Sequence, residues 1–156
     1  ATSIPGLQET LWLWPNNDTM YGSWPASGEI DFSEFYSNHG GLDIPYVHYN
    51  STTTSTSLAN PVNQVTAYNC PITVGAFNTY RLDWEPGQLS IQVNNKTCLV
   101  DDYVPDGGLS SPAPFDQPFF LALTQALGTG ADALVPTTPL PATTQIDYVR
   151  VWGPIK

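Results

Sequence analysis

The sequence has 156 residues, of which 41% are hydrophobic and 12% aromatic, so a single domain over residues 1–156 with one buried core is expected. Fourteen acidic residues against four lysines and arginines give a formal net charge of -10, which excludes the basic stripe that nucleic acid binding needs. The same charge disfavours a sulfated polysaccharide, and no apolar run approaches membrane-spanning length, so the predicted partner is a neutral ligand and no membrane.

Short alternating runs along the chain predict strands, because period-two patterns dominate and no window carries a sustained helical period. In the first run, Thr10, Trp12 and Trp14 share one face of the predicted strand. Later, Asn94-Asn95 can take the left-handed conformations that a tight hairpin turn requires. The strands expected in chain order cover residues 9–14, 28–35, 46–50, 78–84, 88–93, 119–127 and 145–152. An all-β, antiparallel sandwich is therefore predicted.

The two cysteines, Cys70 and Cys98, fall near the expected ends of different strands. A disulfide between them in an oxidising compartment is predicted, which agrees with a secreted, extracellular protein. Two buried free thiols are the alternative, because pairing geometry cannot be read from a sequence.

Three carboxylates crowd into the predicted strand that begins at Gly28. In a regular strand Glu29 and Asp31 point to one face and Glu34 to the other, and like charges side by side repel. A β-bulge at Phe32-Ser33 would return Glu34 to the face of Glu29 and Asp31. Such an arrangement destabilises a strand, so it indicates a site with a chemical role.

Paired carboxylates on one face suit glycoside hydrolysis with retention of configuration. One carboxylate, in that reaction, attacks the anomeric carbon and a second, about 5–5.5 Å away, protonates the leaving oxygen. Asp31 between them would raise the proton affinity of the acid. Two other interpretations stay open at this stage: a solvated acidic edge strand, and a calcium-binding cluster.

The run Glu29-Ile30-Asp31-Phe32-Ser33-Glu34 resembles the signature of glycoside hydrolase family sixteen, the laminarinase-like endoglucanases: Glu, aliphatic, Asp, apolar, any residue, Glu. The likeness follows family order over nearly the whole chain. Besides the signature, it rests on residues 11–15, 21–27, 77–80, 84–87, 117–121 and 147–152.

This resemblance implies a two-sheet jelly roll of the concanavalin A-like kind with a concave groove for a β-glucan. By the same likeness Glu29 is the nucleophile, Asp31 its assisting carboxylate and Glu34 the acid/base. The spacing of the signature is similar to that of laminarinases, so retaining endo-hydrolysis of β-1,3 links is expected. The strands that precede Gly6 in the family are not in this sequence, so the sandwich is expected to be incomplete.

Four further positions are predicted to contact the substrate. Trp24 and Trp12 match groove-lining positions, against the alternative that each packs in a core. His48 could bond a catalytic Glu or the sugar, or be structural. Where the family usually has an Asn, Thr124 or Gln125 has to serve, and Gln125 is the residue we assign.

Asp147 matches the position of a calcium ligand in relatives, but the other ligands have no counterpart, so no metal and no cofactor are predicted. Two other functions remain open: a non-catalytic β-glucan-binding module or inactive fragment, and an endogalactanase or agarase of the same fold. Exposed strand edges would also favour self-association.

Overall fold

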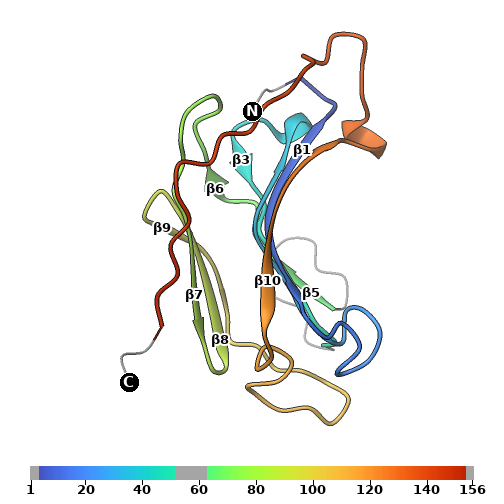
Figure 1. The fold of residues 1–156 in the computed structure, drawn as a ribbon, viewed down its shortest axis with the longest axis vertical. Helices are drawn as coiled ribbons and strands as arrows, with labels where there is room; N and C mark the ends of the chain where they lie inside the picture. Colours follow the sequence, from blue (N-terminus) through green and yellow to red (C-terminus); the bar gives the residue numbers. More distant parts are fainter. Residues whose placement is uncertain (1–3, 52–62, 154–156) are drawn as a thin grey trace.

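Antiparallel strands form almost all of the regular structure in this computed structural model, which describes residues 4–51 and 63–153 (Figure 1). The strands are β1 (Leu7–Pro15), β2 (Glu29–Tyr36), β3 (Leu42–Asp43), β4 (Tyr46–His48), β5 (Gln64–Thr66), β6 (Cys70–Pro71), β7 (Tyr80–Glu85), β8 (Gln88–Val93), β9 (Lys96–Asp101) and β10 (Phe119–Leu127). Two short 3-10 turns, η1 (Ser37–His39) and η2 (Gly130–Asp132), are the helical elements of the described residues, and none of these is long enough to cross a membrane. The predicted all-β class is confirmed.

The longest sheet has the strand order β10-β1-β2-β4-β5, and a second sheet has the order β7-β8-β9. A two-stranded ladder of β3 and β6 completes the described sheets. Figure 1 shows the β7-β8-β9 sheet facing the long sheet, so the two make the layers of a sandwich. The carboxylate strand β2 lies at the centre of the long sheet, with β1 and β4 as its hydrogen-bonded neighbours.

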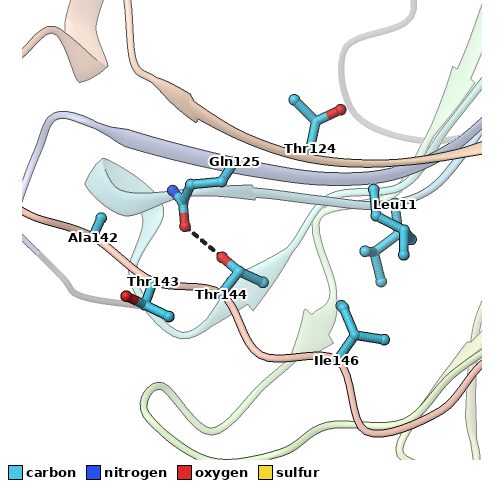
Figure 2. Close-up of a pocket in the computed structure, with 8 residues that line it drawn as sticks. Leu11, Thr124, Gln125, Ala142, Thr143, Thr144 and Ile146 are labelled. Atoms are coloured by element: carbon cyan, nitrogen blue, oxygen red, sulfur yellow. Dashed lines mark hydrogen bonds between the residues drawn. The ribbon is translucent and has the colours of Figure 1, made fainter.

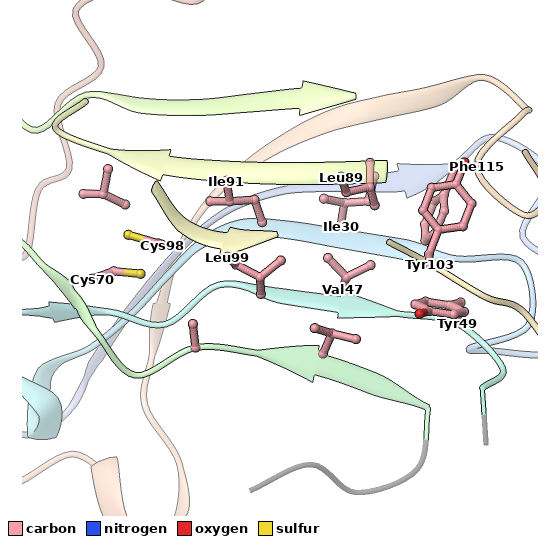
Figure 3. Packing of buried hydrophobic residues seen from close by; sticks show 13 residues of the cluster. Ile30, Val47, Tyr49, Cys70, Leu89, Ile91, Cys98, Leu99, Tyr103 and Phe115 are labelled. Atoms are coloured by element: carbon pink, nitrogen blue, oxygen red, sulfur yellow. The ribbon is translucent and has the colours of Figure 1, made fainter. Parts of the chain in front are cut away.

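The core lies between these two layers (Figure 3). Leu89 and Ile91 of β8 are fully buried, as the alternating pattern of that strand predicts, and they meet Ile30 of β2 and Val47 of β4. The hairpin turn after β8 uses Asn94 and Asn95 at φ 51° and 63°, the left-handed conformation expected there. This packing makes one face of β2 a core face and leaves the other for the site.

The two cysteines are buried in the core cluster as free thiols, so the predicted disulfide is not present in this structure (Figure 3). Each sulfur lies near its own polar neighbour: the Cys70 Sγ is 3.6 Å from Asn69 Oδ1, and the Cys98 Sγ is 3.6 Å from the carbonyl oxygen of Lys96. Burial raises the pKa of the Cys70 thiol and keeps it protonated. Here the cysteines act as small core residues.

The last predicted strand, residues 145–152, is also not formed. This segment is extended but joins no ladder, and Val151 and Trp152 are 89% and 76% exposed. A strand is stable only when a neighbouring strand pairs its backbone groups, and the described residues offer this segment no such neighbour. Its apolar alternation alone therefore misled the prediction.

Candidate active site

A β-bulge in β2 brings the three carboxylates to one face of the long sheet. Along β1, Thr10 pairs with Glu34 and Leu11 with Ser33, but the next residue, Trp12, pairs with Asp31. Phe32 is therefore the extra residue, and the register shift confirms the bulge predicted at Phe32-Ser33. Beyond it, Glu34 returns to the face that carries Asp31.

Glu29 begins β2, half-buried, beside an aromatic cluster. The indole N–H of Trp24 donates to Glu29 Oε2 at 2.6 Å, and the ring of Trp24 lies 5.3 Å from that of His48. Trp24 is 55% exposed, so it does not pack in the core and leaves a ring face free for a ligand. The prediction that Trp24 lines the site fits this placement.

Asp31 and His48 form the buried centre of the site. Asp31 is 2% exposed, and its Oδ2 lies 3.4 Å from His48 Nε2. The imidazole stacks on the ring of Tyr46 at 5.5 Å, and burial lowers its pKa, so His48 is neutral near pH 7. Neutral His48 can hydrogen-bond Asp31 without adding a charge, so it lies beside Asp31 and not against a glutamate, the contact that the sequence suggested.

Glu34 is held by two side chains that the sequence reasoning missed. The hydroxyl of Tyr36 donates to Glu34 Oε2 at 2.7 Å, and the amide of Gln8 lies 3.4 Å from Glu34 Oε1. Tyr36 follows Glu34 by two residues, so the period of a strand places both on one face and is the signal that could have found it. Gln8 likewise precedes Thr10, the cross-strand partner of Glu34, by two residues.

All three carboxyl groups have raised pKa values. Burial and the nearby charge of Asp31 raise the pKa of Glu29 to about 7, and the same two causes raise that of Glu34 to about 7. Burial raises the pKa of Asp31 to about 7. Because ionising one carboxyl makes ionising the next harder, the cluster holds both protonated and ionised acids near neutral pH. A retaining hydrolase needs that mixture.

Among the described residues, Glu29, Asp31 and His48 form the one group of three side chains that could hold a metal, with ligand atoms within 4.8 Å of one another. Calcium prefers six to eight oxygen ligands, so a set that includes an imidazole nitrogen does not fit the calcium-cluster interpretation. Asp147 lies exposed in the C-terminal segment, away from this group. The solvated edge-strand interpretation fails as well, because β2 is a central strand with Asp31 buried.

Of the two remaining substrate contacts, Trp12 is on the site face and Gln125 is not. The indole of Trp12 donates to Thr124 Oγ1 at 2.9 Å, and Thr124 pairs with Thr10, which in turn pairs with Glu34. Figure 2 shows Gln125 on the other side of β10, pointing to Thr144, whose hydroxyl donates to Gln125 Oε1. The assignment of Gln125 to the substrate was therefore wrong, since adjacent strand residues face opposite ways and Thr124 occupies the site face.

The pocket in Figure 2 lies on that opposite side, with a volume of about 310 Å³. Gln125, Thr144, Leu11 and Ile146 are among its lining residues. Thr124 also lines this pocket, but the pocket does not include any of the three carboxylates of the candidate site.

Together, the antiparallel sandwich and the bulged strand of three carboxylates match what the resemblance to glycoside hydrolase family sixteen implies for the fold. The chain is 32% identical over 147 residues to keratan-sulfate endo-1,4-beta-galactosidase from Sphingobacterium multivorum, and 30% identical over 158 residues to glucan endo-1,3-beta-glucosidase A1 from Niallia circulans. Each alignment covers 94% of this chain, which spans 33% and 22% of those relatives. No family model matches the sequence.

The solved structure of SCLam, a non-specific endo-β-1,3(4)-glucanase from family sixteen, superposes on 80% of this chain and 43% of its own with a TM-score of 0.62 and 25% identity. The expected resemblance to family sixteen is thus confirmed in sequence and in fold. The chain is similar to endo-β-glucanases and their relatives along most of its length.

Proposed function

We propose that this chain hydrolyses a neutral β-glucan within the polymer, with retention of configuration, and that β-1,3 links are its substrate. The observation that carries the proposal is the bulge, which puts Glu34 on the face of Glu29 and Asp31 at the centre of the long sheet. The net charge of -10 supports a neutral polymer over a charged one.

Each carboxylate has a role in this reaction. Ionised Glu29 attacks the anomeric carbon while protonated Glu34 gives its proton to the departing glycosidic oxygen, so one C–O bond forms as another breaks. Glu34, now ionised, then takes a proton from a water molecule as that water attacks the anomeric carbon and displaces Glu29. The two inversions give net retention of configuration. Burial, and then the nearby charge of Asp31, raise the pKa of Glu34 and so favour its protonated form.

Glycosidic cleavage and its stereochemistry test the proposal together. Incubation with laminarin, followed by reducing-end assays and proton NMR of the first product, is expected to give new ends that are first β. Glu29→Gln and Glu34→Gln should each abolish the new ends, whereas Glu85→Gln, an exposed acid of β7, should not. An α product formed first, or activity in Glu29→Gln, would overturn the assignment.

An endogalactanase or agarase of the same fold is the second candidate, because the 32% identical relative is named an endo-1,4-beta-galactosidase. The acidic charge of this chain opposes the sulfate groups of that relative's polymer. Rates on laminarin, lichenan, galactan, agarose and keratan sulfate would rank the substrates. Retardation in laminarin gels without cleavage of any of them would indicate a non-catalytic binding module.

We also propose that the protein acts outside the cell, where a glucan polymer is met. A thiol count on protein recovered from culture medium tests this proposal together with the disulfide. Two titratable thiols after denaturation would match the free cysteines of the structure, and none would indicate that Cys70 and Cys98 pair on secretion.

A further inference from the structure

The bulge in β2 points two consecutive side chains toward the interior. Phe32 packs against the core cluster, and Ser33, its neighbour, is 4% exposed. In a regular strand one of the two would face the site, so the bulge depends on holding both inward. If the register slipped by one residue, Glu34 would turn away from Glu29.

On the core side of the sheet, Ser33 is hydrogen-bonded to the buried carboxyl group of Asp43. The hydroxyl of Ser33 donates to Asp43 Oδ1 at 2.6 Å, and Asp43, in β3, is 0% exposed. The next residue, Ile44, donates its backbone N–H to the carbonyl oxygen of Glu34 at 2.8 Å. Ser33 and Glu34 of β2 are thus hydrogen-bonded to Asp43, the last residue of β3, and to Ile44, which follows it.

Asp43 is costly to bury there. Its Oδ2 has no hydrogen-bond partner, and burial raises the pKa of its carboxyl to about 8. The side chain of Tyr80, from β7 in the opposing sheet, faces both Ser33 and Asp43, and its own pKa is raised by burial and then by Asp43. A buried acid with an unsatisfied oxygen destabilises a fold, so its retention beside the bulge requires a reason.

We propose that Ser33 and Asp43 are positioning residues for the proposed hydrolysis: their hydrogen bond fixes the bulge register that presents Glu34 beside Glu29. The proposal rests on the proposed function for its rate measurements only. Neither side chain touches the substrate face, since both lie on the core side of β2.

The chain offers a matched control in a second buried serine–aspartate pair. The hydroxyl of Ser37 donates to Asp132 Oδ1 at 2.9 Å and accepts from the backbone N–H of Leu7 in β1 at 3.0 Å. Both members of the pair are buried, and these contacts join η1 to η2 and to the start of β1 without reaching the bulge. Ser33→Ala and Ser37→Ala should therefore both lower the unfolding midpoint. Only Ser33→Ala should lower kcat, by about tenfold or more with KM little changed, because the acid is misplaced.

Conservative variants separate the hydrogen bond from general packing. Asp43→Asn keeps an acceptor oxygen for Ser33 and should retain most of the rate, whereas Asp43→Leu removes it and should match Ser33→Ala. Equal loss of kcat in Ser33→Ala and Ser37→Ala, or none in either, would overturn the positioning role. So would an Asp43→Leu enzyme with a normal rate.

A second readout does not need activity. Carboxyl carbon NMR can follow the titration of Glu34, whose surroundings include Asp31, Glu29, His48 and the hydroxyl of Tyr36. In Ser33→Ala the pKa of Glu34 should fall toward its ordinary value as the carboxyl leaves the buried cluster, and in Ser37→Ala it should stay. An unchanged titration in Ser33→Ala overturns the inference even if the wild-type chain cleaves no substrate, a result that would defeat the proposed function alone.

Discussion

The hydrogen bond from Trp24 to Glu29 affects the pKa of the proposed nucleophile. Because the indole N–H donates to the carboxylate at 2.6 Å, it favours the ionised form and opposes the burial that raises the pKa of Glu29. Trp24→Phe keeps an aromatic ring but loses the donor, so the pKa of Glu29 should rise.

The acidic limb of kcat/KM for Trp24→Phe should accordingly move to higher pH, by about one unit. Trp84→Phe is the control, since its indole donates to the carbonyl oxygen of Phe115, away from the carboxylates. A limb that stays in place in Trp24→Phe would show that this bond does not tune the nucleophile.

The hairpin between β8 and β9 determines how the second sheet closes over the core. Asn95 has φ 63°, which costs about 1 kcal/mol for a residue that cannot bond locally in the left-handed region. Asn95→Ala should lower the free energy of unfolding by about that amount, and Asn95→Gly should not. Urea denaturation of the two variants makes the comparison, and equal stabilities would contradict the turn geometry.

The sequence predicts a strand and its buried face correctly where the pattern of apolar and charged residues allows only one arrangement. In β8 the alternation predicts the buried face, and in β2 a bulge is predicted because the proposed chemistry needs Glu34 on the face of Glu29 and Asp31. Gln125 could not be assigned because β10 is apolar on both faces and only its register with β1 decides which residue faces the site. The last strand failed because its alternation does not reveal which neighbouring strand would pair with it. Cys70 and Cys98 do lie together, but a sequence does not reveal whether two neighbouring thiols are oxidised.

Across the molecule, buried acids make stability depend on pH. The pKa of Asp31 is raised by burial to about 7 and that of Asp43 to about 8, so the folded protein keeps their protons at a pH where the unfolded chain has lost them. Their stabilising contribution is therefore complete below about pH 4 and is lost as the pH rises to about 8. Burial lowers the pKa of His48, so its contribution has the opposite sign and reduces the stability of the folded protein at acidic pH.

The unfolding midpoint should thus be higher at about pH 5 than at about pH 8.5. Asp43→Asn cannot titrate at this position, so its midpoint should depend less on pH across that range. Calorimetry at several pH values checks both, and a midpoint that rises with pH would contradict the raised pKa values.

The exposed apolar strand β10 is where two copies of the chain could associate. Among the described strands, β10 lies at the edge of the long sheet and carries no charged residue, and its Phe120, Leu123 and Leu127 are 49%, 45% and 55% exposed. We propose that such an edge pairs with a second copy, so the sedimentation coefficient should rise with concentration. Leu123→Lys should restore a single monomeric species, and a monodisperse wild-type chain would refute the pairing.

Chemical rescue of Glu29→Ala tests the central claim most directly, because a missing nucleophile can be replaced from solution. Glu29→Ala should cleave no laminarin by itself and, with azide, should release a glycosyl azide of inverted configuration, since a single displacement replaces two. Glu34→Ala should yield no such inverted product. Normal hydrolysis by Glu29→Ala without azide would contradict the assignment of Glu29 as the nucleophile.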